Sequence, residues 1–265
     1  MTTLELLELS LLAGGGLLAG ILAGFLGIGG GTVLVPFLVA LAYQPVQAVA
    51  TSSLVILVTA TSGSMQNWLM GTLSFQRVIY LGLPALLTAP VGAYVANYLK
   101  PYILLLGFGL FLVLNIFLVE VRKRITSDEE GAMHQPFDPI LARILTGSTA
   151  GLMAGMFGVG GGVIMVPLQI VLLGETIKVA IQTSLGVIAI AATSACVGHF
   201  LQNPDNLLLL PGLVLGMGGL VGAQISTRFL RRLPDEVITI AFRSFLAIMA
   251  IYILWEAWNS YRLGL

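Results

Sequence analysis

Charged residues are scarce in this sequence. Lys and Arg number 12 and Asp and Glu 12 in 265 residues, 9% of the chain, whereas 57% is hydrophobic. A soluble domain carries about 25% charged residues on its wetted surface, so this composition excludes one. No charged residue lies between Glu8 and Arg77, and several later uncharged stretches reach the roughly 20 residues that a helix needs to cross a bilayer. Because backbone groups in hydrocarbon must pair internally, we predict an all-α polytopic membrane protein.

Other features are missing as well. The single cysteine, Cys196, cannot form an intrachain disulfide, and we interpret it as a small packed hydrophobe. Segments such as 103–118 do not alternate apolar and polar residues, which argues against a transmembrane barrel. The N-terminus carries Glu5 and Glu8 in place of a basic region, so no secretory signal peptide is expected.

Motifs for catalysis and cofactors are also lacking. The sequence contains no phosphate-binding loop of the Gly-x-x-x-x-Gly-Lys-Ser/Thr type, no His-Glu-x-x-His and no cluster of His and Cys. With a net charge of zero, nothing favours nucleic acid as a partner. We therefore expect no enzyme activity, no cofactor and no metal. The expected partner is the lipid bilayer, with the chain a multi-pass protein of the cell membrane.

Ten apolar segments follow one another along the chain, with boundaries good to a few residues. Prolines and Trp or Tyr residues cluster near their ends, as helix starts and interfacial aromatics do. The predicted segments are 6–26, 32–43, 46–69, 75–97, 102–121, 140–157, 163–173, 177–201, 207–229 and 237–258.

The sequence repeats itself at an offset of 131 residues. Residues 20–36 read GILAGFLGIGGGTVLVP and residues 151–167 read GLMAGMFGVGGGVIMVP, with nine of the 17 positions identical. The same offset places Ser52 and Ser53 on Thr183 and Ser184. We infer two related halves of five segments each. Residues 1–121 form the first, residues 122–138 a polar linker, and residues 139–265 the second.

The second segment of each half is too short to cross the membrane. Its 11 or 12 residues cover roughly 18 Å of a core about 30 Å thick, so we predict a half-membrane helix. If the first two segments return to the side they entered from, three crossings remain per half, and the second half is inverted. Arg77, the linker arginines and Arg228 then share one side, the cytoplasmic side by the positive-inside rule. The first segment is long enough to span alone, which would change this parity.

The glycine runs between the first two segments of each half are the main candidate site. Three consecutive glycines disfavour helix, so the chain should unwind there and expose backbone N–H groups beside a helix N-terminus, which attracts anions. Broken helices meeting at mid-membrane bind substrates in secondary transporters. The alternative is close helix packing, which we favour for the flanking Gly20, Gly24, Gly151 and Gly155. The predicted site contains Gly29, Gly30, Gly31, Thr32, Gly160, Gly161 and Gly162.

Uncharged hydrogen-bond donors recur inside the third segment of each half. Ser52, Ser53, Thr183 and Ser184 could bond an anion's oxygens without the desolvation cost of a buried charge. They could equally bond their own or a neighbouring helix. Both readings stay open.

Three further residues are weaker candidates. Asn67 and His199 lie near segment ends, where interfacial solvation is the favoured interpretation. Arg243 lies inside an apolar segment, which makes it a functional candidate, although it could extend to the interface.

These motifs together resemble the sulfite exporter TauE/SafE family, also described as toluene-sulfonate uptake permeases. The resemblance covers nearly the whole chain and rests on the paired Gly-x-Gly-Gly-Gly runs, Pro36 and Pro167, the downstream Thr-Ser-Ser-Leu and Gln-Thr-Ser-Leu, and the two halves. It implies secondary transport of a small sulfur-containing anion, such as sulfite, a sulfonate or sulfoacetate, in either direction and possibly with a coupling proton. Two alternatives remain, an anion channel and a non-transporting partner of a sulfur-metabolism enzyme.

Overall fold

The computed structural model describes residues 3–127, 138–230 and 232–263. Within these residues the chain is entirely helical, which confirms the predicted all-α class. The elements are α1 Thr3–Leu26, α2 Gly31–Ala40, α3 Pro45–Leu69, α4 Phe75–Tyr98, α5 Pro101–Ser127, α6 Pro139–Phe157, α7 Gly162–Leu173, α8 Ile177–Gln202, the short 3-10 helix η1 Pro204–Asn206, α9 Leu209–Leu230 and α10 Asp235–Arg262.

Each predicted segment corresponds to one helix, and most boundaries differ by one to four residues. Among the described residues six helices are long and apolar enough to span a membrane, namely α1, α3, α4, α6, α8 and α9. Many of their large apolar side chains face outward, Leu87 at 74% and Leu201 at 76% exposure among them. An outward apolar surface suits lipid, because hydrocarbon solvates these side chains as well as a protein core does.

The predicted linker begins later than its composition suggests. α5 continues through Ser127, so the first six residues of the predicted linker, Arg122 to Ser127, are helical. Charged residues are good helix formers, and a helix can continue beyond its apolar part, a point that apolar content alone does not reveal. Residues 128–137 lie outside the described part of the chain.

The two halves are interlocked. α1 packs along α9, and α6 along α4, so the first helix of each half lies against the fourth helix of the other. Small residues make these contacts close. A methyl group at Gly20 would collide with the carbonyl oxygen of Gly219, and one at Gly151 with that of Ala85. This confirms the packing role predicted for these flanking glycines.

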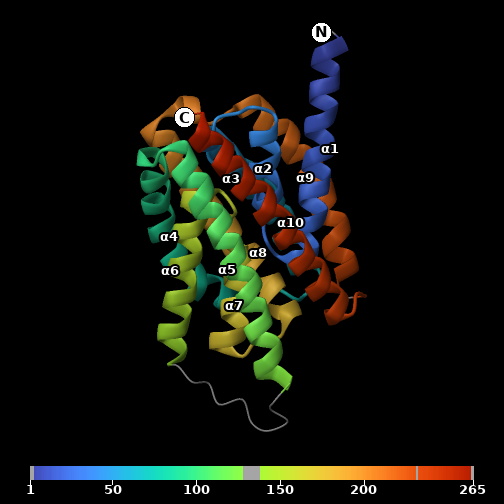
Figure 1. Ribbon diagram of the computed structural model, residues 1–265. Helices are drawn as coiled ribbons and strands as arrows, with labels where there is room; N and C mark the ends of the chain where they lie inside the picture. The colour runs from blue at the N-terminus through green and yellow to red at the C-terminus, as the bar shows by residue number, and fades with distance from the viewer. Residues whose placement is uncertain (1–2, 128–137, 231, 264–265) are drawn as a thin grey trace.

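Helix positions correspond between the halves, and Figure 1 shows that their directions differ. α1 runs inward from the end of the molecule where the N-terminus lies, whereas α6 begins at the opposite end. α5 and α10 likewise run in opposite directions, and the short helix α2 returns toward the end where α1 starts. These directions agree with an inverted repeat. Inversion about an axis in the membrane plane stays a prediction, because the membrane is not part of the structure.

Candidate functional site at the junction of the glycine turns

Two glycine turns, residues 27–31 and 158–162, separate the paired helices of each half. α1 ends at Leu26 and α2 begins after Gly30; α6 ends at Phe157 and α7 begins after Gly161. Gly30 and Gly161 are the N-cap residues, with φ of 84° and 75°. Residues with a Cβ rarely adopt such angles. The glycine runs therefore allow each chain to reverse inside the apolar region.

The two turns meet face to face. A Cβ on Gly31 would lie 2.5 Å from the Cα of Val159 in the other turn, and one on Gly162 would lie 2.9 Å from the Cα of Ile28. Ile28 and Val159 are both fully buried. The repeated motif therefore brings the N-termini of α2 and α7 to one place, where we call the contact between the two turns the junction.

The central helices α3 and α8 cover the junction with one isoleucine each. A Cβ on Gly29 would lie 3.1 Å from Cγ2 of Ile56 and 3.0 Å from Cγ2 of Ile188. One on Gly160 would meet the same two methyl groups at 3.0 and 2.8 Å. In this conformation the junction is closed and apolar on that side.

Hydroxyl groups of α3 and α8 join the halves at the junction. Ser52 donates a hydrogen bond to the carbonyl oxygen of Gly158, and Ser184 donates to that of Gly27 over 3.1 Å. Both acceptors lie just beyond a helix end, where carbonyls lack intrahelical partners. Here these two serines satisfy the turns, which is the helix-bonding alternative allowed by the sequence.

Ser53 corrects the alignment of the repeat. It donates to Val49 of its own helix over 3.1 Å, so the partner of Ser184 across the two halves is Ser52. The structural offset for α3 and α8 is 132 residues, as their starts at Pro45 and Ile177 show. α7 is two residues longer than α2 and its connection to the next helix one residue shorter, which shifts the register by one.

Thr32 is the unsatisfied polar group beside the junction. Its side chain is fully buried in the first turn of α2, and its Oγ1 has no hydrogen-bond partner. The equivalent position in α7 holds Val163, also fully buried. N–H groups in the first turn of a helix also lack intrahelical partners. The junction thus offers a hydroxyl and backbone donors, whereas Thr183, 3% exposed on α8, has no assigned contact there.

Asn67 and His199 are fully buried, so their predicted interfacial solvation is wrong. They occupy equivalent positions on α3 and α8 at the structural offset of 132. His199 Nε2 lies 2.9 Å from the carbonyl oxygen of Gly155 and Nδ1 lies 3.3 Å from the amide nitrogen of Asn97, which suits a neutral ring protonated on Nε2. Asn67 differs, because neither its amide nitrogen nor its amide oxygen has a partner.

Arg243 lies on α10 and is partly exposed. α10 packs mainly along α5, with a smaller contact to α2. This position shows neither a link from Arg243 to the junction nor a free guanidinium.

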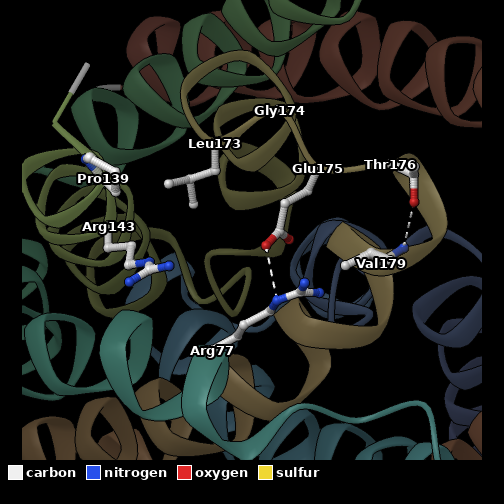
Figure 2. Close-up of a pocket in the computed structure, with 8 residues that line it drawn as sticks. All are labelled: Arg77, Pro139, Arg143, Leu173, Gly174, Glu175, Thr176 and Val179. Carbon is white, nitrogen blue, oxygen red and sulfur yellow. Dashed lines mark hydrogen bonds and ion pairs between the residues drawn. The ribbon is translucent and has the colours of Figure 1, made fainter. Parts of the chain in front are cut away.

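A charged cavity that the sequence analysis did not single out lies at the start of α4 and α6. It has a volume of about 360 Å³ and is lined by Arg77, Arg143, Glu175 and residues next to them. Figure 2 shows both guanidinium groups and the Glu175 carboxylate around the same space. The available signal was that these charges stand at segment boundaries, which the proposed topology places on one side. Among the described residues no group of His, Cys, Asp or Glu could hold a metal ion.

Comparison with known proteins agrees with this architecture. The family model described as Sulfite exporter TauE/SafE matches residues 12–253. The chain is 26% identical to a probable membrane transporter protein, YunE, of Bacillus subtilis (strain 168), covering 91% of this chain and 95% of that protein. A probable membrane transporter protein of Methanocaldococcus jannaschii is 24% identical, covering 94% and 96%. No solved structure matches.

The family model spans nearly the whole chain, both glycine turns included. The relatives align over almost their entire lengths, so the likeness extends to the complete two-half architecture. The chain therefore belongs to the sulfite exporter TauE/SafE family of membrane transporters.

Proposed function

We propose that the protein is a secondary transporter that moves a small sulfur-containing anion, such as sulfite, a sulfonate or sulfoacetate, across the cell membrane. The anion binds at the junction, between the N-termini of α2 and α7. One observation carries this proposal: two short helices, 131 residues apart in the sequence, begin at the same buried place. Each helix N-terminus carries about half a positive charge, so two of them favour an anion and disfavour a cation.

The polar groups at the junction support a small oxyanion. Thr32 supplies a hydroxyl with no partner, and Ser52 and Ser184 supply hydroxyls now bonded to the opposite turn. When the turns separate, these two serines become donors for oxygens of the substrate. Binding without a lysine or arginine avoids the desolvation of a buried charge.

The closed junction favours a carrier over a channel. Gly31 and Gly162 contact the opposite turn and are buried, so passage requires the halves to move apart. A carrier of this kind saturates with substrate, whereas an open channel gives flux that rises in proportion to concentration. A non-transporting partner protein would give neither.

The test is sulfite flux in vesicles reconstituted with the full chain, repeated with organic sulfonates and with and without a proton gradient. Saturable uptake of one of these anions is expected, and stimulation by the gradient identifies a coupling proton. Absence of flux for every anion would overturn the proposal. Linear flux with measurable currents would replace it with an anion channel.

Thr32→Val separates a binding role from a packing role. Valine has the shape of threonine, and Val163 already fills the equivalent position. A hydrogen bond to a charged group contributes about 1.5–3 kcal/mol, so KM for the anion should rise about tenfold or more. Thermal stability should stay equal or increase, because a buried hydroxyl without a partner is removed. An unchanged KM would remove Thr32 from the site; Val163→Thr is the matched control for a hydroxyl in the other half.

A further inference from the structure

We propose that the charged cavity at the start of α4 and α6 is a second anion site, at which Arg77 and Arg143 receive the small oxyanion before it reaches the junction. Glu175 occupies this site when the anion is absent. The proposal rests on the transport function above for the identity of the anion, while the existence of the site is tested independently below.

The first argument is charge. Two arginines and one glutamate line the cavity, a balance of plus one before any ligand binds. Arg143 has no ion pair with Glu175; its guanidinium lies 5.3 Å from the centre of the Tyr80 ring. Stacking on an aromatic ring holds a guanidinium in place while leaving its in-plane N–H groups available. Arg143 is thus a positioned donor beside the cavity.

The second argument is how poorly Glu175 is satisfied. Its Oε1 lies 3.4 Å from Nε of Arg77, a single long contact. Oε2 is buried and has no hydrogen-bond partner. Arginine binds carboxylates and oxyanions best through two parallel bonds, and this pair does not use that geometry. An incoming oxyanion can therefore replace the carboxylate at Arg77 with better contacts.

Burial of Glu175 agrees with this role. The side chain is only 15% exposed, and burial raises the pKa of its carboxyl, against the opposing effect of Arg77 and Arg143. The charged groups near it on the packed elements are Arg77 on α4, Arg143 on α6 and Lys178 on α8. The protein therefore holds this carboxylate at a cost, in a place that suits an exchangeable anion.

The third argument is that the fold does not require these charges. At the offsets that relate the helices, the positions equivalent to Arg77 and Arg143 are Pro211 and Leu12. The corresponding corner of the other half thus lacks both arginines, although its helices have the same arrangement. Charges needed to stabilise the scaffold would be expected in both halves, so these serve one face of the membrane.

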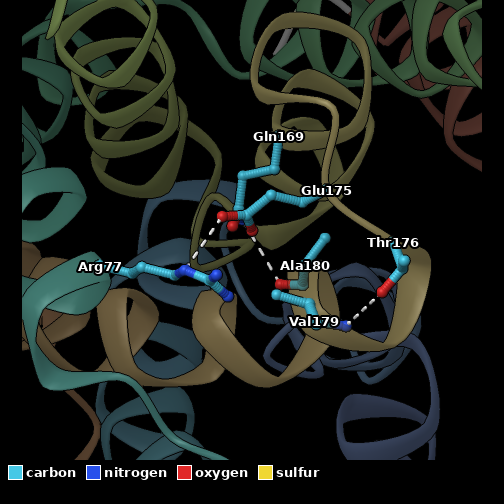
Figure 3. A network of polar contacts seen from close by, with 6 residues as sticks. All are labelled: Arg77, Gln169, Glu175, Thr176, Val179 and Ala180. Atoms are coloured by element: carbon cyan, nitrogen blue, oxygen red, sulfur yellow. Dashed lines mark hydrogen bonds and ion pairs between the residues drawn. The ribbon is translucent and has the colours of Figure 1, made fainter. Parts of the chain in front are cut away.

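The cavity is connected to the junction by a single helix. Leu173, at the end of α7, lines the cavity, and Gly162, at its start, lies at the junction. The 12 residues of α7 span roughly 18 Å. Figure 3 shows Gln169 of α7 extending beside the Glu175 carboxylate, with its Nε2 3.4 Å from the carbonyl oxygen of Ala180. Its Oε1 is buried without a partner, so a further polar group lies on the inner side of the cavity.

The experiment measures the sulfite concentration that half-maximally raises the unfolding temperature of the full-length protein in detergent. It is run in the Thr32→Val background, which weakens binding at the junction. Arg143→Gln should raise this concentration about tenfold, and Arg143→Lys should restore part of the loss. Glu175→Gln should lower it severalfold, because the competing carboxylate is gone. Arg228→Gln is the control, since Arg228 is exposed near the end of α9 and does not line the cavity.

Opposite shifts in the Arg143 and Glu175 variants are the expected result, and general loss of folding cannot produce a tighter site. Equal values for Arg143→Gln, Glu175→Gln and Arg228→Gln would overturn the second site. If these variants behave alike while the parent protein transports sulfite, the second site fails and the transport proposal stands. If the opposite shifts occur but no anion is transported, the site stands and the transport proposal fails.

Discussion

Replacing Ser52 with alanine tests how the two halves are held together. Its hydroxyl donates to Gly158 of the opposite glycine turn, whereas the adjacent Ser53 donates to Val49 within its own helix. The Gly158 carbonyl lies beyond the end of α6 and has no intrahelical N–H partner. The Val49 carbonyl is inside α3 and is already satisfied there by helix geometry. The two serines therefore make hydrogen bonds of unequal worth.

The expected cost follows from this difference. Side-chain hydrogen bonds between membrane helices contribute on average about 0.6 kcal/mol and at most about 1.7. Ser52→Ala also strands a buried carbonyl, so we expect a loss near the upper value. Ser53→Ala should cost close to zero. Ser184→Ala, which removes the bond to Gly27, should resemble Ser52→Ala because the two positions are equivalent.

The assay is reversible unfolding in mixed micelles, titrated with a denaturing detergent and followed by circular dichroism. Ser53→Ala is the control for adding alanine at this depth of α3. The reasoning is refuted if Ser53→Ala destabilises the protein as much as Ser52→Ala, or if neither Ser52→Ala nor Ser184→Ala has any effect. Either result would mean that the hydroxyls do not join the turns.

Three further predictions concern packing, topology and pH. Gly20→Ala and Gly151→Ala place a methyl against a neighbouring backbone carbonyl, so each should destabilise by about 1–3 kcal/mol in the same unfolding assay, whereas Gly14→Ala, with open space around it, should not. Single cysteines replacing Lys100 and Ser127 in a Cys196→Ala background should label from opposite faces of the membrane; labelling from one face contradicts the inverted repeat. Because burial raises the pKa of Glu175, its contribution to stability is present below the unfolded value near 4.5 and lost as pH rises through the folded value, so Glu175→Gln should flatten this part of the stability profile.

The fold was predictable from sequence because the membrane imposes simple constraints. Uncharged stretches of sufficient length must be helices, and the glycine runs mark where two of them break. The register between the halves was not predictable, since it depends on the lengths of α2 and α7 and of their connections. A shift of one residue exchanged Ser53 for Ser52 and hid the equivalence of Asn67 and His199.

The site was predictable only in part. The glycine turns and Thr32 follow from the repeat, and the structure brings the two turns together. The solvation of Asn67 and His199 was misjudged because distance from a segment end does not say which face of a helix is buried. His199 faces Gly155 of another helix, a contact that no local pattern reveals. The charged cavity was missed for the same reason, since its three charges come from α4, α6 and the α7–α8 connection.

The differences between the halves show where specificity should be sought. Two related halves give the transporter a repeated scaffold, with glycine turns, serines and packing glycines present in both. Substitutions that break this repetition cannot be explained by the scaffold, because the other half folds without them. Thr32 stands against Val163, Asn67 against His199, and Arg143 against Leu12. Two of these groups, the Thr32 hydroxyl and the Asn67 amide, are buried without partners, a cost of about 1–3 kcal/mol each that natural proteins seldom keep without a use. Exchanging Thr32 with Val163 should therefore change transport more than it changes the fold.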